Sequence, residues 1–229
     1  SIYWDKKPAG DRYINESSEY SIKISKDGYY EDPNGLDLTT VGVNYDQDFI
    51  LNMGLFPKRP IRLPEVRYVL NKWEFINDET CMSKDSLEFV YNLLKDRPEL
   101  VLELSSHTDS RGRNDRNQIL SENRARACYK YLVEERGIDP RRIVPVGKGE
   151  ESPRTVYIEG EEYHASQREG GEPLILKEAY INKYRRSNKE LFEMLHTMNR
   201  RTEGAVLSLD FDPATAPPAD PKFLTYLPY

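Results

Sequence analysis

The feature that most constrains this chain is a strand, a polar turn and a helix in direct succession, ending at Gly137. The apolar run LVLELS leads into the polar residues HTDSRG, and a helical apolar repeat begins near Leu120. Loops held by such a scaffold commonly carry binding residues. Asp109 lies in the turn and Arg124 in the helix. From the residues alone, this pair is either a structural ion pair or a receptor for a small zwitterion.

Two amphipathic helices are predicted beside this stretch. Ser83 is a suitable N-cap for a helix over residues 84–96, and one face of that helix is apolar (Leu87, Val90, Tyr91 and Leu94). Asp115, with Gln118 three residues later, predicts a capping box at the start of the second helix. Gly137 is expected to end that helix.

Strand patterns separate these helices. Four segments predict strands: RYVLNKWEF, LVLELS, RIVPVGKGE and RTEGAVLSLDF. A third helix, with an apolar face of Leu191, Phe192, Leu195 and Met198, precedes the last strand. The polar segment 151–189 interrupts the alternation as an insertion. The expected fold is therefore α+β, with the order β-α-β-α-β-(insert)-α-β and one mixed sheet packed against helices.

Residues 1–60 predict a separate, small β-rich module. SEYSIKISKDGYY alternates polar and apolar residues and breaks at a turn signal around Gly28. YDQDFILNMGLF predicts a second strand, and EDPNGLDLTTVGVN between them predicts a loop with a short strand. The prolines of FPKRPIRLPEV indicate a boundary. We therefore expect a β-rich module over 1–60, a domain over 61–212, and an extended Pro-rich tail over 213–229.

Composition excludes several functions. The net charge of −6 argues against a general nucleic-acid binder, and no apolar run approaches the roughly 18 residues that span a bilayer. Cys81 and Cys128 lie 47 positions apart without a CxxC motif, so they predict no zinc site and are either a disulfide or two small buried residues. The three histidines (His107, His164 and His196) show no metal-ligand spacing and no nucleophile motif. We expect no enzymatic activity, no metal and no cofactor.

Ordered motifs in the second half of the chain resemble a known family. HTDSRG, Asn117, LSENRARACYKYLVEERGI, RIVPVGKGEESP and MNRRTE occur in the order typical of the OmpA-like C-terminal domain. The resemblance covers roughly residues 65–210. It implies binding of peptidoglycan through the diaminopimelate of the stem peptide, whose free end carries an ammonium and a carboxylate. Asp109 matches the family's Asp in the TD motif and Arg124 the Arg in the RA motif, so they are expected to bind these two groups.

The resemblance also suggests further pocket residues. Arg201 and Asn117 match family positions, and Thr108 and Ser110 offer hydroxyls beside Asp109. Two alternatives stay open: Asn117 can hold the turn instead of the ligand, and Arg200 and Arg201 can be a solvated pair. The segment WEFIND departs from the family's first strand, because Glu74 and Ile76 stand where the family has two aspartates.

The implied function is a non-enzymatic anchor in the periplasm, associated with the outer membrane through parts outside this sequence. Its expected partners are peptidoglycan and other proteins of an envelope or secretion complex. Residues 1–60 resemble the end of a carboxypeptidase regulatory-like sandwich. Together with the insertion, this module order is similar to Bacteroidota envelope lipoproteins, including a component of type IX secretion. The alternative is a protein-interaction module that has lost peptidoglycan binding.

Overall fold

The computed structural model describes residues 14–31, 35–43, 49–51, 53–58, 61–79, 81–165 and 171–229. The chain divides into two compact units, Ser1–Arg59 and Pro60–Tyr229. Nowhere in these described ranges is a helix long and apolar enough to cross a membrane.

The first unit contains one antiparallel strand pair, β1 (Glu19–Ile22) and β2 (Leu36–Thr39). β1 forms where the alternating pattern predicts it, and the turn at Gly28 has a φ of 80°. β2 is the short strand expected in EDPNGLDLTTVGVN. The strand predicted in YDQDFILNMGLF is not found in its described part, residues 49–51 and 53–56, and residues 45–48 and 52 lie outside the described residues.

The second unit is built on a four-stranded mixed sheet, so the α+β fold class predicted from the sequence is confirmed. The strands are β3 (Ile61–Arg62), β6 (Val101–His107), β7 (Ile143–Gly147) and β11 (Arg201–Ser208), in the order β3-β11-β6-β7. β6 and β7 are parallel, as expected for strands joined by a helix. β11 is antiparallel to both of its neighbours.

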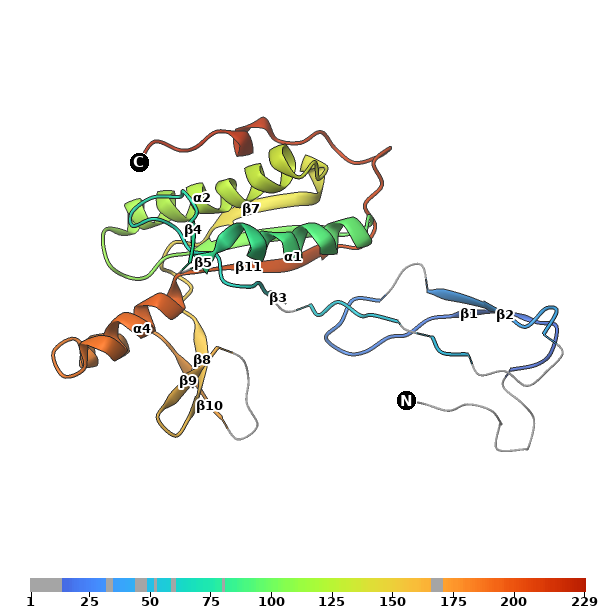
Figure 1. Ribbon diagram of the computed structural model, residues 1–229, viewed down its shortest axis with the longest axis horizontal. Coiled ribbons are helices and arrows are strands. Elements are labelled where there is room, and N and C mark those ends of the chain that lie inside the picture. The colour runs from blue at the N-terminus through green and yellow to red at the C-terminus, as the bar shows by residue number, and fades with distance from the viewer. Residues whose placement is uncertain are drawn as a thin grey trace. The chain divides into compact units, whose positions relative to one another are not determined.

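Two long helices, α1 (Ser83–Asp96) and α2 (Asn114–Lys130), lie against this sheet (Figure 1). Leu87, Val90 and Leu94 of α1 are fully buried, and each such side chain stabilises the fold by about 1.5–3 kcal/mol. α2 continues into a π turn, η1 (Tyr131–Glu135), and ends at Gly137, whose φ is 73°. β7 approaches α2 so closely that a Cβ at Gly147 would overlap the backbone of Glu122.

Three local predictions in this unit are wrong. RYVLNKWEF is not a strand; Tyr68 and Phe75 form one bridge around a tight turn, and the short pair β4 (Asn77–Asp78) and β5 (Cys81–Met82) follows. Ser83 does not cap α1, because its hydroxyl instead bonds the N–H and the carbonyl of Arg67, each at 2.9 Å.

The third wrong prediction is the capping box at the start of α2. The N-cap position is Arg113, and Asp115 forms an exposed ion pair with that residue's side chain at 2.6 Å. Gln118 instead donates to the carbonyl of Gly147 at 2.8 Å. The helix therefore begins without the reciprocal box, and Gln118 joins α2 to β7. Cys81 and Cys128 are both free, so the disulfide alternative does not hold in this structure.

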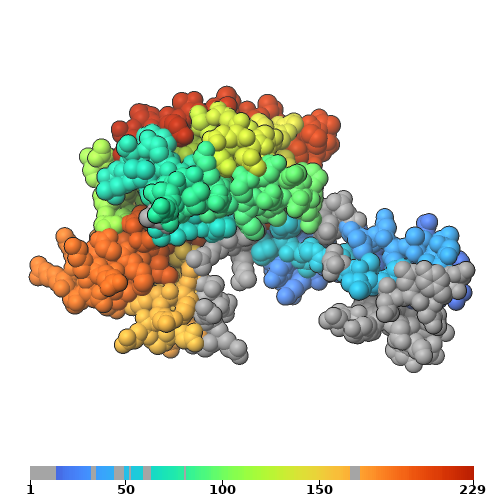
Figure 2. Space-filling model, viewed as in Figure 1, coloured from blue at the N-terminus to red at the C-terminus, as the bar shows by residue number. Residues whose placement is uncertain are grey.

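The insertion folds into its own small layer. Its strands β8 (Thr155–Glu159), β9 (Glu162–His164) and β10 (Glu172–Ile175) pair in the order β10-β8-β9, followed by α3 (Glu178–Ile181), η3 (Asn182–Tyr184) and α4 (Lys189–Asn199). Its buried core consists of Val156, Leu176, Ile181 and Leu195. The insertion and α4 project from the second unit as a lobe (Figure 2).

Residues 213–229, called here the strap, run along α2 and include η4 (Pro221–Leu224) (Figure 1). The side chain of Asn123 donates to the carbonyl of Leu227 at 2.9 Å and accepts from its N–H at 2.7 Å. Arg126 donates to the carbonyl of Lys222 at 3.0 Å. The strap is therefore attached to α2 through its own backbone.

Candidate functional site

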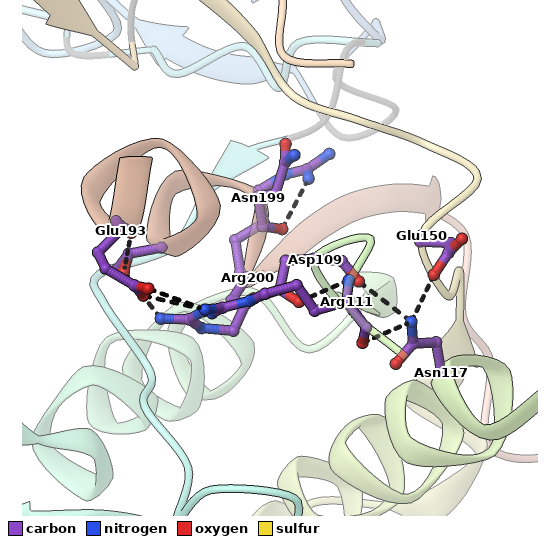
Figure 3. A network of polar contacts seen from close by, with 9 residues as sticks. Asp109, Arg111, Asn117, Glu150, Glu193, Asn199 and Arg200 are labelled. Atoms are coloured by element: carbon purple, nitrogen blue, oxygen red, sulfur yellow. Dashed lines mark hydrogen bonds and ion pairs between the residues drawn. The ribbon is translucent and has the colours of Figure 1, made fainter. Parts of the chain in front are cut away.

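The turn after β6 is held by Asn117. Its side-chain amide donates to the carbonyls of Asp109 (3.2 Å) and Arg111 (3.3 Å) and to the carboxylate of Glu150 (Figure 3). Gly112 in this turn has a φ of 113°, in the region that favours glycine. Asn117 therefore has its donors occupied by the protein itself, which favours its role in holding the turn.

Asp109 forms ion pairs with two arginines, Arg111 at 2.8 Å and Arg200 at 2.5 Å (Figure 3). Arg111 also pairs with Glu193 of α4 at 3.0 Å. Burial by itself raises the pKa of Asp109, but the hydrogen bonds from Arg111 and Arg200 outweigh it and hold the pKa below its usual value. The carboxylate is thus ionised and already neutralised by protein cations.

Arg124 is in the opposite situation. Its side chain lies in the interior of the unit, and the residue is 5% exposed. Its Nε–H donates to the carbonyl of Lys72 at 3.1 Å, and its guanidinium lies 4.9 Å from the ring centre of Tyr68. Burial lowers the pKa of Arg124 from its ordinary value. No carboxylate of the described residues pairs with it. The other two buried arginines, Arg126 and Arg142, donate to several backbone carbonyls.

Arg124 and Arg200 line a pocket of about 270 Å³ at the end of β6 and the start of β11. Its lining residues are Glu65, Val66, Arg67, Tyr68, Ile76, His107, Arg124, Thr197, Arg200 and Arg201. Three of its four arginines are paired: Arg67 with Glu65 at 2.9 Å, Arg200 with Asp109, and Arg201 with Glu203 at 2.6 Å. The remaining guanidinium, that of Arg124, can donate two parallel hydrogen bonds to a carboxylate.

One of the residues that line the pocket, His107, is a buried histidine. His107 Nε2 lies 3.5 Å from the carboxylate of Glu203, an ion-pair distance rather than a close hydrogen bond. Burial lowers the pKa of His107. Burial by itself raises the pKa of Glu203, but His107 and Arg201 outweigh it and lower the pKa to about 2. This pair therefore places a fixed carboxylate under Arg201 and a largely neutral imidazole in the pocket wall.

The structure brings some of the residues predicted for this site together and not others. Arg124 and Arg201 line the pocket, and Asp109 reaches it through Arg200. Asp109 and Arg124 do not form the structural ion pair that was the alternative reading. The hydroxyls of Thr108 and Ser110 are buried, and neither makes a hydrogen bond within the described part of the chain.

Sequence reasoning did not place Arg111 and Tyr68 in the site, and it considered Arg200 only as part of a solvated pair with Arg201. In the structure, each of these two arginines pairs with a carboxylate instead, Arg200 with Asp109 and Arg201 with Glu203. Arg200 stands one position before Arg201, at the end of α4, and the change from helix to strand turns the two side chains in different directions. Tyr68 was placed on a strand that does not form. The signal that could have identified Arg111 is its position in TDSRGR, two residues after Asp109.

The fold therefore places a buried guanidinium without a carboxylate partner among the described residues at a pocket, and a guanidinium has the geometry to donate two hydrogen bonds to a carboxylate. Residues 80–165 match the OmpA family. The chain is 36% identical over 85 residues to outer membrane porin F of Pseudomonas aeruginosa, an alignment that covers 36% of this chain and 24% of the porin. The chain thus spans about a quarter of that relative's length.

Two solved structures are also similar in part. An outer membrane protein from Borrelia burgdorferi B31 aligns with a TM-score of 0.38 at 17% identity, covering 66% of this chain and 96% of that one. The peptidoglycan-associated lipoprotein from Burkholderia pseudomallei aligns with a TM-score of 0.38 at 16% identity, covering 62% of this chain and 86% of that one.

Proposed function

We propose that the second unit binds peptidoglycan non-covalently, through the diaminopimelate end of the stem peptide, and anchors an envelope complex to the cell wall. The observation that carries this proposal is the Arg124 guanidinium, buried against the pocket without a carboxylate partner among the described residues. A buried charge without a counter-charge is costly. A ligand carboxylate supplies the missing counter-charge. The OmpA family domain at residues 80–165 supports the choice of peptidoglycan as the polymer.

The proposed capture includes an exchange at Asp109. A diaminopimelate end carries an ammonium beside its carboxylate. In the complex, the ammonium replaces Arg200 on the Asp109 carboxylate, while Arg111 stays in place through its second pair with Glu193. Arg200 is then free to join Arg124 on the ligand carboxylate. After the exchange every buried charge has a counter-charge, whereas without ligand Arg124 has no carboxylate partner among the described residues.

The affinity of one site is expected to be modest. Each hydrogen bond to a charged group contributes about 1.5–3 kcal/mol net, and displacing Arg200 offsets part of that gain. Retention on the wall then comes from the many copies of the ligand in the polymer and from tethering of the protein. A purely binding role needs no nucleophile and no metal, so we propose that the protein is not an enzyme.

Co-sedimentation with purified diaminopimelate-type peptidoglycan tests this function. Wild type should sediment with the polymer, and Asp109→Ala and Arg124→Ala should stay in the supernatant. Arg113→Ala is the matched control, because it removes an arginine near the same turn whose side chain is 79% exposed and outside the pocket. If the Arg124→Ala protein sediments like wild type, the site is wrong; if wild type stays in solution, the function is wrong.

One observation favours a second candidate function. Asp109 is already held by Arg111 and Arg200, as expected of a protein-interaction module whose pocket is filled by its own side chains. Arg200→Ala separates the two. Loss of Arg200 weakens sedimentation if this residue meets the ligand carboxylate. A module that has lost binding shows no sedimentation in wild type, with or without Arg200.

The cellular role follows from this binding. We propose a periplasmic protein, associated with the outer membrane, that links an envelope complex to the wall. The finer assignment to a type IX-like secretion complex rests on the order of the β-rich module, the domain and the insertion. Its test is co-purification of the full chain with outer-membrane secretion proteins after mild cross-linking. Recovery of peptidoglycan without such proteins would support the anchoring function and contradict the secretion role.

A further inference from the structure

One wall of the pocket is the irregular segment 65–77, and the domain core fixes the two sides of its turn. Ser83 bonds both backbone groups of Arg67, and the N–H of Ile76 donates to the carbonyl of Arg67 at 2.9 Å. The hydroxyl of Tyr68 lies 3.2 Å from the sulfur of Cys128 and 3.1 Å from the hydroxyl of Thr202. These contacts fix residues 67–68 and 75–76 on the domain core. The turn between them is closed by its own backbone, because the N–H of Val69 donates to the carbonyl of Glu74 and the N–H of Lys72 to the carbonyl of Val69, each at 3.0 Å.

That turn carries the carbonyl that orients Arg124. Lys72 accepts the Nε–H of Arg124 at 3.1 Å, and this is the hydrogen bond that fixes the plane of the guanidinium. Within the turn, Leu70 is 82% exposed and contributes little packing. The ion pair between Lys72 and Glu74, at 3.6 Å, is exposed and therefore weak. The backbone bonds set the shape of the turn, and the ring of Trp73 adds a contact between the turn and a distant part of the chain.

Trp73 is held by the strap. Its ring lies 5.2 Å from the ring of Tyr226, with the planes at 40°, and 6.0 Å from the ring of Tyr229, with the planes at 88°. The bonds between Asn123 and Leu227 attach the strap to α2 between these two tyrosines. Aromatic rings at these separations attract one another beyond the effect of burial alone. The strap therefore connects α2 to the turn that orients Arg124.

We propose that Trp73, Tyr226 and Tyr229 are positioning residues for the carboxylate-binding guanidinium. The two tyrosines hold the Trp73 turn, the turn holds the Lys72 carbonyl, and this carbonyl keeps Arg124 with its terminal nitrogens at the pocket. All three residues lie outside the stretch 80–165 that matches the OmpA family. The inference deepens the proposed function and rests on it for the identity of the ligand.

The test measures both affinity and the Arg124 side chain. Affinity for a soluble alanyl-glutamyl-diaminopimelate tripeptide is measured by calorimetry, and hydrogen exchange of the Arg124 Nε–H is measured by NMR without ligand. Tyr226→Ala/Tyr229→Ala should weaken affinity about tenfold, as expected for the loss of two aromatic pairs. The same change should accelerate exchange of the Nε–H at least about tenfold, because its acceptor moves.

Three further variants separate positioning from stability. Tyr226→Phe/Tyr229→Phe keeps the rings and should restore both readouts to wild type. Phe223→Ala removes a strap ring that contacts Tyr129 instead of Trp73, and should change neither readout more than about twofold. Tyr229→Ala alone, at a residue that is 43% exposed, should leave the fold intact and give an intermediate effect.

Two outcomes overturn the inference. The first is an alanine pair whose affinity and Arg124 exchange equal those of wild type. The second is a Phe223→Ala protein whose affinity falls and whose Arg124 exchange accelerates as much as in the Tyr226→Ala/Tyr229→Ala protein, since the strap would then act on stability alone. If wild type does not bind the tripeptide, the proposed function fails, and the Arg124 exchange rates still decide whether the strap positions this side chain.

Discussion

Asp109 and Arg124 differ in how their charges are neutralised. Asp109 has two cationic partners, whereas Arg124 has a backbone carbonyl and an aromatic face. Weak neutralisation of a buried guanidinium lowers stability, and a ligand carboxylate would recover that free energy on binding. The asymmetry predicts that the empty pocket prefers an anion first, with the ammonium of the ligand adding specificity at Asp109.

Asn117→Ala should destabilise the fold by about 1–3 kcal/mol, because the carbonyls of Asp109 and Arg111 and the Glu150 carboxylate lose their donor. Urea unfolding measures this change. Asn117→Asp is a useful companion, since it keeps the size and removes the donor beside Glu150. A protein of unchanged stability that no longer binds peptidoglycan would instead make Asn117 a ligand contact.

Glu203 makes stability depend on pH. Its pKa is about 2 in the folded protein, below the ordinary value of 4.5, so its contribution is complete above about pH 5 and is lost as pH falls toward 2. The loss should amount to about 2–3 kcal/mol between pH 6.5 and pH 2.5. Asp109 acts in the same direction, because its pKa is also lowered.

Glu203→Gln should therefore flatten, without removing, the acid limb of the stability curve. Urea midpoints at pH 6.5 and pH 2.5 provide the measurement, with Glu161→Gln, an exposed acid in the insertion, as the control. Equal acid sensitivity in wild type and Glu203→Gln would show that the ion pair of Glu203 with Arg201 and its contact with His107 add nothing.

At the scale of elements, α4 joins the insertion to the candidate site. Glu193 pairs with Arg111, and Arg200 at the end of the helix reaches Asp109. On its other side, Asn199 donates to the carbonyl of Leu176 and accepts from the N–H of Arg154. One helix thus carries both the contacts to the Asp109 turn and the attachment of the three-stranded insertion.

Leu176→Ala tests whether the insertion is an independent cooperative unit. Leu176 is fully buried, and its truncation should cost about 2–5 kcal/mol of local stability. We expect hydrogen exchange to accelerate in β8 and β10 while β6 and β7 keep wild-type rates. Ile175→Ala, at the exposed neighbouring position that ends β10, is the control. Equal acceleration in the central sheet would mean that the insertion and the sheet unfold together.

At the scale of the whole molecule, the order of the elements and the motif residues could be predicted from the sequence. Segments whose conformation depends on contacts with residues distant in the sequence could not. The succession of strands and helices follows from apolar periodicity, and Arg124 and Arg201 follow from motif positions. The strand predicted over RYVLNKWEF fails because Ser83 and the strap hold this segment as a turn. Neither contact has a local signal: Ser83 lies 16 residues from Arg67, and Tyr226 lies far beyond Trp73 in sequence.

The same reason explains the candidate site. The sequence pattern placed Asp109 and Arg124 near one turn. Of the partners that the structure gives them, Arg111 is local, but Lys72 lies 52 residues from Arg124 and Arg200 lies 91 residues from Asp109. Arg200 reaches Asp109 only because the insertion and α4 return the chain to the end of β6. Such contacts are set by the topology of the sheet, which local periodicity does not encode.

The most direct test of the central claim is a crystal structure of the full chain with the alanyl-glutamyl-diaminopimelate tripeptide. We predict the ligand carboxylate on the terminal nitrogens of Arg124, its ammonium on Asp109, and Arg200 moved from Asp109 to the ligand. A structure in which Arg200 still holds Asp109, with the tripeptide bound elsewhere or absent from the pocket at saturating concentration, would contradict the account.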